Sequence, residues 1–306
     1  MLKTVLSVSL GSSKRDHSAK LHLMGQDFQL KRIGTDGSME KMLSLIREYD
    51  GKVDVFGLGG MDLYIQAVDR RYTLRDAQKV ASAAQKTPIV DGSGLKNTLE
   101  KRVIEYLNEE TDIFLEKQKA SVVSAMDRFG MAKSLEEAGF EMKYGDLVFV
   151  LNIPILITSL STLAFLARLI VPVIRLLPFS MLYPTGKKQE SAKPRNPRFF
   201  LDADIIAGDL HYIKRYMPEK LPGKVIITNT VTKDDVILLR NAGVEVLITT
   251  TPEIEGRSFG TNVMEALLVA YTGSKAELEA EEYLQLLREL DFKPRILELQ
   301  RGGSEL

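Results

Sequence analysis

Two residues in the second half of the chain have the side chains needed to move a proton. Asp209 precedes His211 by two positions, directly after the apolar run 203–207 that predicts a β-strand. Histidine titrates near neutral pH, so His211 can exchange a proton with a substrate hydroxyl while Asp209 orients it. The alternative is that Asp209 caps a helix and His211 lies on the surface. The sequence thus predicts an acid/base pair, with a capping alternative.

Polar residues that follow other predicted strands are candidates for binding a cofactor. In an open parallel sheet, ligands bind beyond the carboxyl ends of the strands, where loops and helix N-termini converge. Asp127, Arg128 and Gly130 follow the predicted strand 122–126, and Arg128 suits a pyrophosphate. Further candidates at strand ends are Asn152, Asn229, Thr230, Thr249, Thr250 and Thr251.

This set predicts a polar small-molecule cleft that holds NAD or NADP. A dinucleotide fingerprint has three glycines, and the turn after residue 126 offers only Gly130. The alternative is that Gly130 serves the packing of a helix on a strand.

A separate candidate site for an anion lies at the start of a later predicted helix. Arg257 and Ser258 lead through Gly260 to Thr261 and Asn262. Backbone N–H groups at a helix start favour a phosphate or carboxylate, which an arginine can bind in a bidentate manner. The alternative is that Thr261 or Asn262 only caps the helix.

Alternating strands and helices must position these residues. The predicted strands of the second half are 122–126, 147–151, 203–207, 225–228 and 244–248, and the predicted helices are 130–138, 232–243, 262–270 and 276–290. Apolar strands that alternate with helices are typical of a parallel sheet covered on both faces. We therefore expect an α/β protein whose second domain is a Rossmann-like, doubly wound parallel sheet.

The expected domains are an N-terminal α/β domain (1–118), the Rossmann-like domain (119–274), and a C-terminal helix and tail (275–306). The first domain is expected to contain a first strand at 1–10, a hairpin over 21–30, a helix from Ser38 to Gly51, a strand at 53–56, a helix capped by Thr73, a strand at 88–90 and a helix ending near Glu110.

The apolar stretch 147–183 interrupts the second domain. Residues 147–167 carry no charge, and only Arg168 and Arg175 interrupt the remainder, which meets the length criterion for a membrane span. Asn152 and Pro154 break the run, so the uninterrupted helical part is nearer 159–171 and too short to span. We expect a buried strand and an apolar helical insertion. The alternatives are a lid, a homo-oligomer face and a peripheral membrane contact.

Composition limits the classes of function. Lys plus Arg and Asp plus Glu each number 41, a balance that argues against a nucleic-acid partner. The chain has no Cys, which excludes disulfides and thiolate chemistry, and its three His are too scattered to predict a metal site. Residues 1–10 read as a strand rather than a secretory signal, so a cytoplasmic location is expected.

Four motifs resemble those of a known bacterial family. They are Asp127–Ala132, Tyr183–Gly186, Ala207–Tyr212 and Gly256–Asn262. Over nearly its whole length, the chain resembles the family labelled quinate 5-dehydrogenase, which is similar to quinate and shikimate dehydrogenases. The resemblance implies a two-domain α/β oxidoreductase that uses NAD or NADP on a hydroxyl of a small cyclic hydroxy acid. No catalytic residue is carried over from it.

The leading hypothesis is therefore an NAD(P)-dependent oxidoreductase with a small-molecule substrate. One alternative is a non-catalytic protein that binds a nucleotide or a phosphorylated metabolite at 257–262. The other is a protein that docks on a membrane or a partner through 147–183.

Overall fold

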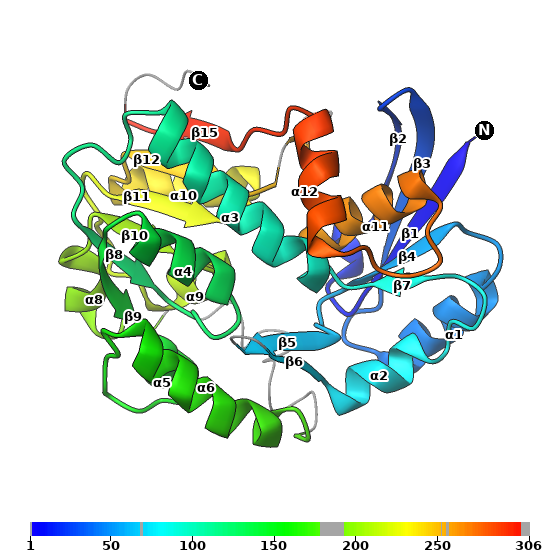
Figure 1. Cartoon of the computed structure of the whole chain (residues 1–306), viewed down its shortest axis with the longest axis horizontal. Helices are drawn as coiled ribbons and strands as arrows, with labels where there is room; N and C mark the ends of the chain where they lie inside the picture. Colours follow the sequence, from blue (N-terminus) through cyan, green and yellow to red (C-terminus); the bar gives the residue numbers. More distant parts are fainter. Residues whose placement is uncertain (1, 68–69, 178–192, 252, 255–256, 301–306) are drawn as a thin grey trace.

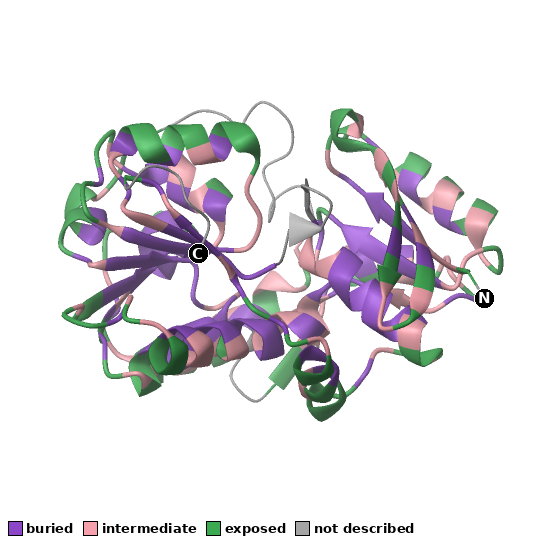
Figure 2. Cartoon of the chain, turned by 90° about the horizontal axis from the view of Figure 1, so that it is seen from above, coloured by how far each residue is buried: buried purple, intermediate pink, exposed green. Residues whose placement is uncertain are grey.

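The computed structural model describes residues 2–67, 70–177, 193–251, 253–254 and 257–300. It has two α/β halves, one built on strands β1–β7 and the other on strands β8–β15 (Figure 1). The central strands of each sheet are buried, whereas the edge strand β2 is partly exposed (Figure 2). Tyr183–Gly186 and Gly256, two parts of the predicted motifs, lie outside the described residues.

The N-terminal sheet has the strand order β2-β3-β1-β4-β7. β2 is antiparallel to β3, and the other four strands are parallel. Its elements are β1 (Lys3–Ser9), η1 (Ser13–Arg15), β2 (His17–Leu23), β3 (Gln26–Gly34), α1 (Met39–Tyr49), β4 (Val55–Gly59), α2 (Arg75–Ala81) and β7 (Ile89–Val90), with a separate hairpin of β5 (Tyr64–Ala67) and β6 (Arg70–Thr73).

The C-terminal sheet has the order β15-β12-β11-β10-β8-β9, in which only β15 is antiparallel to its neighbour. Its strands are β8 (Lys119–Val122), β9 (Glu141–Tyr144), β10 (Ile205–Ala207), β11 (Val225–Thr228), β12 (Val246–Thr249) and β15 (Arg295–Glu298); a two-stranded ribbon, β13 (Glu253–Ile254) and β14 (Arg257–Ser258), follows β12. The predicted α/β class and the doubly wound parallel sheet are confirmed.

Helices cover both faces of the C-terminal sheet. On one face lie α3 (Ser93–Glu110), α4 (Phe129–Glu137) and α12 (Ala280–Glu289); on the other lie α5 (Asp146–Phe149), α8 (Pro197–Leu201), α9 (Leu210–Tyr216) and α10 (Lys233–Ala242). Successive residues of a strand point to opposite faces, so Ile205 joins the first layer and Ile206 the second.

Two helices belong to the cores of both halves. α3 and α11 (Thr261–Thr272) share one hydrophobic cluster with Val5 and Phe28 of the N-terminal sheet and with Val122 and Ile227 of the C-terminal sheet. One cluster therefore contains residues of both sheets, and the division into domains at residues 118 and 274 stays a prediction.

Several local predictions are confirmed. The hairpin lies at β2–β3, Ser38 caps α1, and α3 ends at Glu110. Thr232 and Asp235 form the predicted capping box of α10, which ends at Gly243 with φ of 89°. Each of these signals depends on residues within about one turn of chain, so tertiary contacts did not override them.

The predicted strand 147–151 is wrong. Residues 146–149 form the short helix α5, and the strand is β9, at 141–144. A short apolar run fits a buried helix as well as a buried strand, whereas the strand has the alternating pattern of exposed Glu141 and buried Met142.

Two further predictions differ from the structure, and two elements of the structure were not predicted. The strand predicted at 122–126 ends at Val122, and the residues after it form a loop. Leu74 rather than Thr73 precedes α2, because Thr73 pairs with Tyr64 in the β5–β6 hairpin, which was not predicted. The antiparallel edge strand β15 was not predicted either.

The apolar stretch contains the predicted helix, α6 (Leu160–Ile174), which starts after the N-cap residue Ser159. The C-cap residue of α6, Arg175, contacts the N-terminal half of the molecule. Its carbonyl accepts a hydrogen bond from the backbone amide of Arg75 at 3.1 Å. Within the described residues, no helix is both long and apolar enough to cross a membrane.

A buried carboxyl group joins the two halves where β7 leads into α3. Glu265 of α11 is fully buried; it accepts hydrogen bonds from the amide of Gly92 at 2.5 Å and from the hydroxyl of Tyr283 at 2.7 Å. Gly92 has φ of 94°, a conformation that favours glycine. Burial raises the pKa of Glu265 to about 8.

We predict that Glu265 makes the stability of the protein depend on pH. The folded state keeps the Glu265 proton up to about pH 8, while the unfolded chain loses it near its ordinary pKa of 4.5, so stability falls as pH rises between these values. In Glu265→Gln, urea unfolding should show a smaller loss of stability from about pH 5 to about pH 8, a difference on the order of a few kcal/mol.

The matched control is Glu281→Gln, which changes an exposed carboxylate of α12. It should keep the pH dependence of the unmodified protein. An equal slope in Glu265→Gln and the unmodified protein would contradict a neutral Glu265.

Candidate functional site

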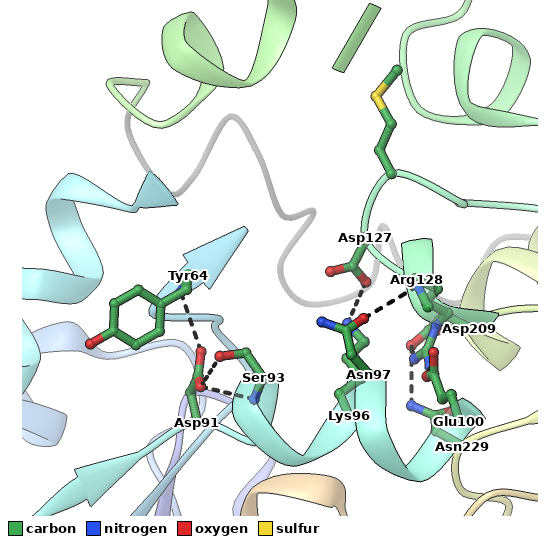
Figure 3. Close-up of polar contacts among 12 residues, drawn as sticks. Tyr64, Asp91, Ser93, Lys96, Asn97, Glu100, Asp127, Arg128, Asp209 and Asn229 are labelled. Atoms are coloured by element: carbon green, nitrogen blue, oxygen red, sulfur yellow. Dashed lines mark hydrogen bonds and ion pairs between the residues drawn. The ribbon is translucent and has the colours of Figure 1, made fainter. Parts of the chain in front are cut away.

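The topology of the C-terminal sheet brings two strand ends together. After β8 the chain adds β9 on one side, and it then crosses to add β10 on the other side of β8. At such a switch point the following loops diverge and leave room for a ligand. The loops after β8 and β10 carry Asp127, Arg128 and Asp209, which lie close together in Figure 3.

Helix α3 contributes a row of polar side chains toward these loops. Ser93, Lys96, Asn97 and Glu100 follow the i, i+3, i+4, i+7 spacing of one helix face, and all four are drawn on that face in Figure 3. Sequence reasoning missed this row. A polar stripe opposite the predicted apolar residues of the same helix is its only sequence signal, and such a stripe usually faces solvent.

Lys96 and Asp127 form an ion pair between the two elements. The Lys96 Nζ lies 2.8 Å from the Asp127 Oδ2, and the side chains are 12% and 37% exposed. Burial alone would lower the pKa of Lys96, but the neighbouring carboxyl groups of Asp127, Asp62 and Glu100 together outweigh it and raise that pKa. Burial likewise opposes ionisation of Asp127, but Lys96 and Arg128 together outweigh it, so the pKa of Asp127 is lowered. At neutral pH the pair is therefore an ammonium and a carboxylate.

Arg128 is buried and already paired with carboxylates. Its guanidinium contacts Glu100 of α3 directly and lies 3.5 Å from the Asp209 Oδ2. Burial opposes the charge of Arg128, but these carboxylates raise its pKa overall. Arg128 therefore ties α3 to both switch-point loops, and a pyrophosphate would have to compete with Glu100 and Asp209 for it.

Asp146 holds the loop that precedes Asp127. This buried carboxylate accepts hydrogen bonds from the amides of Ala125 at 3.0 Å and Met126 at 2.7 Å. Burial raises its pKa to about 6, although both hydrogen bonds oppose the shift. Asp146 thus positions the loop and does not face a ligand.

The loops after β10 and β11 add the remaining members of the site. Asp209 caps α9 by accepting a hydrogen bond from the His211 amide at 2.8 Å, as in the capping alternative. The Asn229 side-chain amide donates to the other Asp209 oxygen at 3.3 Å, and Thr230 follows it, half-buried. His211 is exposed. The acid/base role of Asp209 and His211 stays a prediction.

Other predicted cofactor residues serve the fold. Thr249 and Thr250 are at most 1% exposed, and the Thr249 hydroxyl donates to the carbonyl of Thr251. Burial removes both side chains from contact with a cofactor. A side chain at Gly130 would meet Asn97 of α3 at 3.0 Å, so this glycine permits the close packing of α4 on another helix, α3, and not on a strand as the packing alternative expected.

The predicted anion site lies at the contact between α11 and the N-terminal sheet. Gly260 is the N-cap of α11, so neither Thr261 nor Asn262 caps it. The side-chain amide of Asn262 donates a hydrogen bond to the Ser7 hydroxyl at 3.0 Å. The backbone of Asn262 lies so close to Gly92 that a side chain at Gly92 would not fit. The side chains of Arg257 and Ser258 lie outside the described part of the chain.

The N-terminal half contributes a second polar group beside the α3 row. Asp91, at the end of β7, accepts hydrogen bonds from the amides of Leu63 and Tyr64 and from Ser93 (Figure 3). The Arg71 guanidinium stacks on the Tyr64 ring at 3.5 Å and pairs with Glu277 at 2.6 Å. Tyr64 is thereby fixed at the N-terminal side of the α3 row.

The chain is distantly similar to several solved structures. An NAD-dependent malic enzyme from Thermotoga maritima has 13% identity and a TM-score of 0.33, with 99% of this chain and 85% of that chain covered. A glutamate dehydrogenase from Thermus thermophilus has 10% identity and a TM-score of 0.40, with 95% and 74% covered.

A periplasmic ribose ABC transporter protein from Conexibacter woesei has 10% identity and a TM-score of 0.37, with 94% of each chain covered. Since these three TM-scores are below 0.5, the similarities do not indicate what this chain binds. No curated protein matched the sequence.

Two families match consecutive parts of the chain. Residues 4–91 match the family described as Domain of unknown function (DUF8753), and residues 94–299 match the family described as Domain of unknown function (DUF8754). The two matches meet at the start of α3. Because the second match spans more than half of the sequence, this chain belongs to the DUF8754 family.

Proposed function

We propose that this protein is an NAD(P)-dependent oxidoreductase that interconverts a hydroxyl and a carbonyl group of a small polar molecule. The observation that carries the proposal is the ion pair of Lys96 and Asp127 at the switch point of a doubly wound sheet. The resemblance described above favours a cyclic hydroxy acid as the substrate.

The switch-point residues suit the ribose of a dinucleotide but not its pyrophosphate. Asp209, Asn229 and Thr230 supply a carboxylate, an amide and a hydroxyl, groups that hydrogen-bond ribose hydroxyls. Arg128 and Gly130 do not suit a pyrophosphate, because the first is neutralised and the second packs against Asn97. The dinucleotide is therefore assigned to the loops after β10 and β11, and when bound it supplies or accepts a hydride.

Lys96 is the proton donor of the proposed reaction. Its ammonium can hydrogen-bond a carbonyl oxygen and stabilise the negative charge that develops there during reduction, before passing a proton to that oxygen. Asp127 keeps Lys96 charged and oriented. In the direction of oxidation the deprotonated amine of Lys96 takes the hydroxyl proton and becomes the ammonium again. Because the pKa of Lys96 is raised, reduction should persist at alkaline pH.

A non-catalytic protein that binds a polar metabolite is the second candidate. The neutralised Arg128 and the packed Gly130 favour it, since neither presents a site for a dinucleotide's pyrophosphate. Binding of small hydroxy acids without any dinucleotide would distinguish this candidate from the oxidoreductase.

One prediction of the proposed function concerns the cofactor. Isothermal titration calorimetry should detect binding of NAD or NADP, and Asn229→Ala should weaken it about two- to tenfold, because one hydrogen bond to the ligand is lost. Asn241→Ala, at an exposed position of α10, should leave the affinity unchanged. If neither dinucleotide binds the unmodified protein, the proposed function fails.

Another prediction of the proposed function concerns the chemical step. With a panel of hydroxy acids that includes quinate and shikimate, turnover is followed through the absorbance of the reduced nicotinamide. Lys96→Met should lower turnover by about 10²-fold or more, because the proton donor is lost, while the dinucleotide affinity stays the same.

Lys101→Met is the matched control, since Lys101 lies on the same helix with a side chain 54% exposed. It should keep full turnover. Undiminished turnover in Lys96→Met would assign the proton transfer to another residue.

A further inference from the structure

Helix α6 exposes a continuous apolar face. Its opposite side packs Ala167 and Val171 against Ile65, Tyr72 and Met126. The exposed side carries four large apolar residues at helical spacing. They are Phe165 (61% exposed), Leu169 (58%), Val173 (62%) and, just after the helix, Leu176 (52%). Single exposed apolar residues are common, but a row of four on one helix face marks an interaction surface.

The loop between α5 and α6 adds further exposed apolar residues. They are Val150, Ile153 and Ile155, at 45%, 41% and 57% exposure. A cation lies beside them, because the Arg195 guanidinium contacts the Asn152 side chain and donates to the carbonyl of Val148 at 3.2 Å. We refer to these three residues and the four of α6 together as the apolar face.

Within the described residues, the two segments that carry or adjoin the apolar face have only positive charges. Residues 147–177 and 193–201 contain Arg168, Arg175, Lys193, Arg195 and Arg198, and no Asp or Glu. The whole chain, by comparison, has equal numbers of acidic and basic residues. Apolar side chains combined with cations are the signature of a helix that lies in the plane of a lipid surface.

We propose that the apolar face docks this protein on an anionic lipid surface, with α6 lying in the interface. The charges favour this occupant over a second copy of the chain, because a symmetric dimer would bring two copies of the same cationic patch together. The length of α6 also fits a helix that lies on a bilayer, since it is too short to cross one. The proposal does not depend on the proposed function.

Sedimentation of the full-length protein with vesicles tests the proposal. The protein should sediment with phosphatidylcholine vesicles that contain about 30% phosphatidylglycerol, less with pure phosphatidylcholine, and less at high salt. The double variant Phe165→Gln and Leu169→Gln should bind at least about tenfold more weakly, because two large apolar groups no longer enter the lipid. Lys193→Gln and Arg198→Gln should each weaken binding about fivefold.

The matched control is Ile237→Gln with Leu238→Gln, which changes two exposed apolar residues of α10. It should bind like the unmodified protein. Circular dichroism melting shows whether each variant is folded. We expect all of them to fold, because the substituted side chains are exposed. The proposal is overturned if the protein stays in the supernatant with anionic vesicles, or if the α6 variant sediments as before. It is also overturned if light scattering finds a dimer that the α6 variant dissociates.

Discussion

Arg128 is a buried cation, and the arrangement of the candidate site depends on how its charge is neutralised. Glu100 comes from α3 and Asp209 from the loop after β10, so one guanidinium joins three segments that are far apart in the sequence. Removing one partner of a buried ion pair leaves an uncompensated charge and typically costs about 3–5 kcal/mol. The interaction therefore holds α3 against the carboxyl ends of the C-terminal strands.

This constraint decides which side chains are left for a ligand. Glu100 lies one helical turn after Lys96, so fixing Glu100 on Arg128 also directs Lys96 toward Asp127. Asp146 holds the loop that carries Asp127 by accepting hydrogen bonds from two backbone amides. Arg128 consequently belongs to the framework of the site, and the groups available for chemistry are Lys96, Asp127 and the Asn229 amide.

The two halves of the molecule are held together at separate places by different kinds of contact. α11 approaches the backbone of Gly57 and Gly92 closely, and the neutral Glu265 joins it to the start of α3. On the other side α6 packs on the β5–β6 hairpin through small and branched apolar residues. With contacts on both sides, α3 and its polar row have a fixed place between the sheets, while Phe165, Leu169 and Val173 on the outer side of α6 are exposed.

The sequence by itself determined the α/β class, the parallel strands β10 and β11, and the capping box of α10, because each follows from the spacing of residues near one another in the chain. It also placed Asp127, Asp209 and Asn229 at strand ends, since the strand-end rule needs only the order of elements. The tertiary structure decided the rest. Lys96 becomes a partner of Asp127 only when α3 packs on the loop after β8, 31 residues further along the chain. Residues 146–149 form a helix and Thr249 is buried because of packing between distant segments, and no local periodicity records such packing.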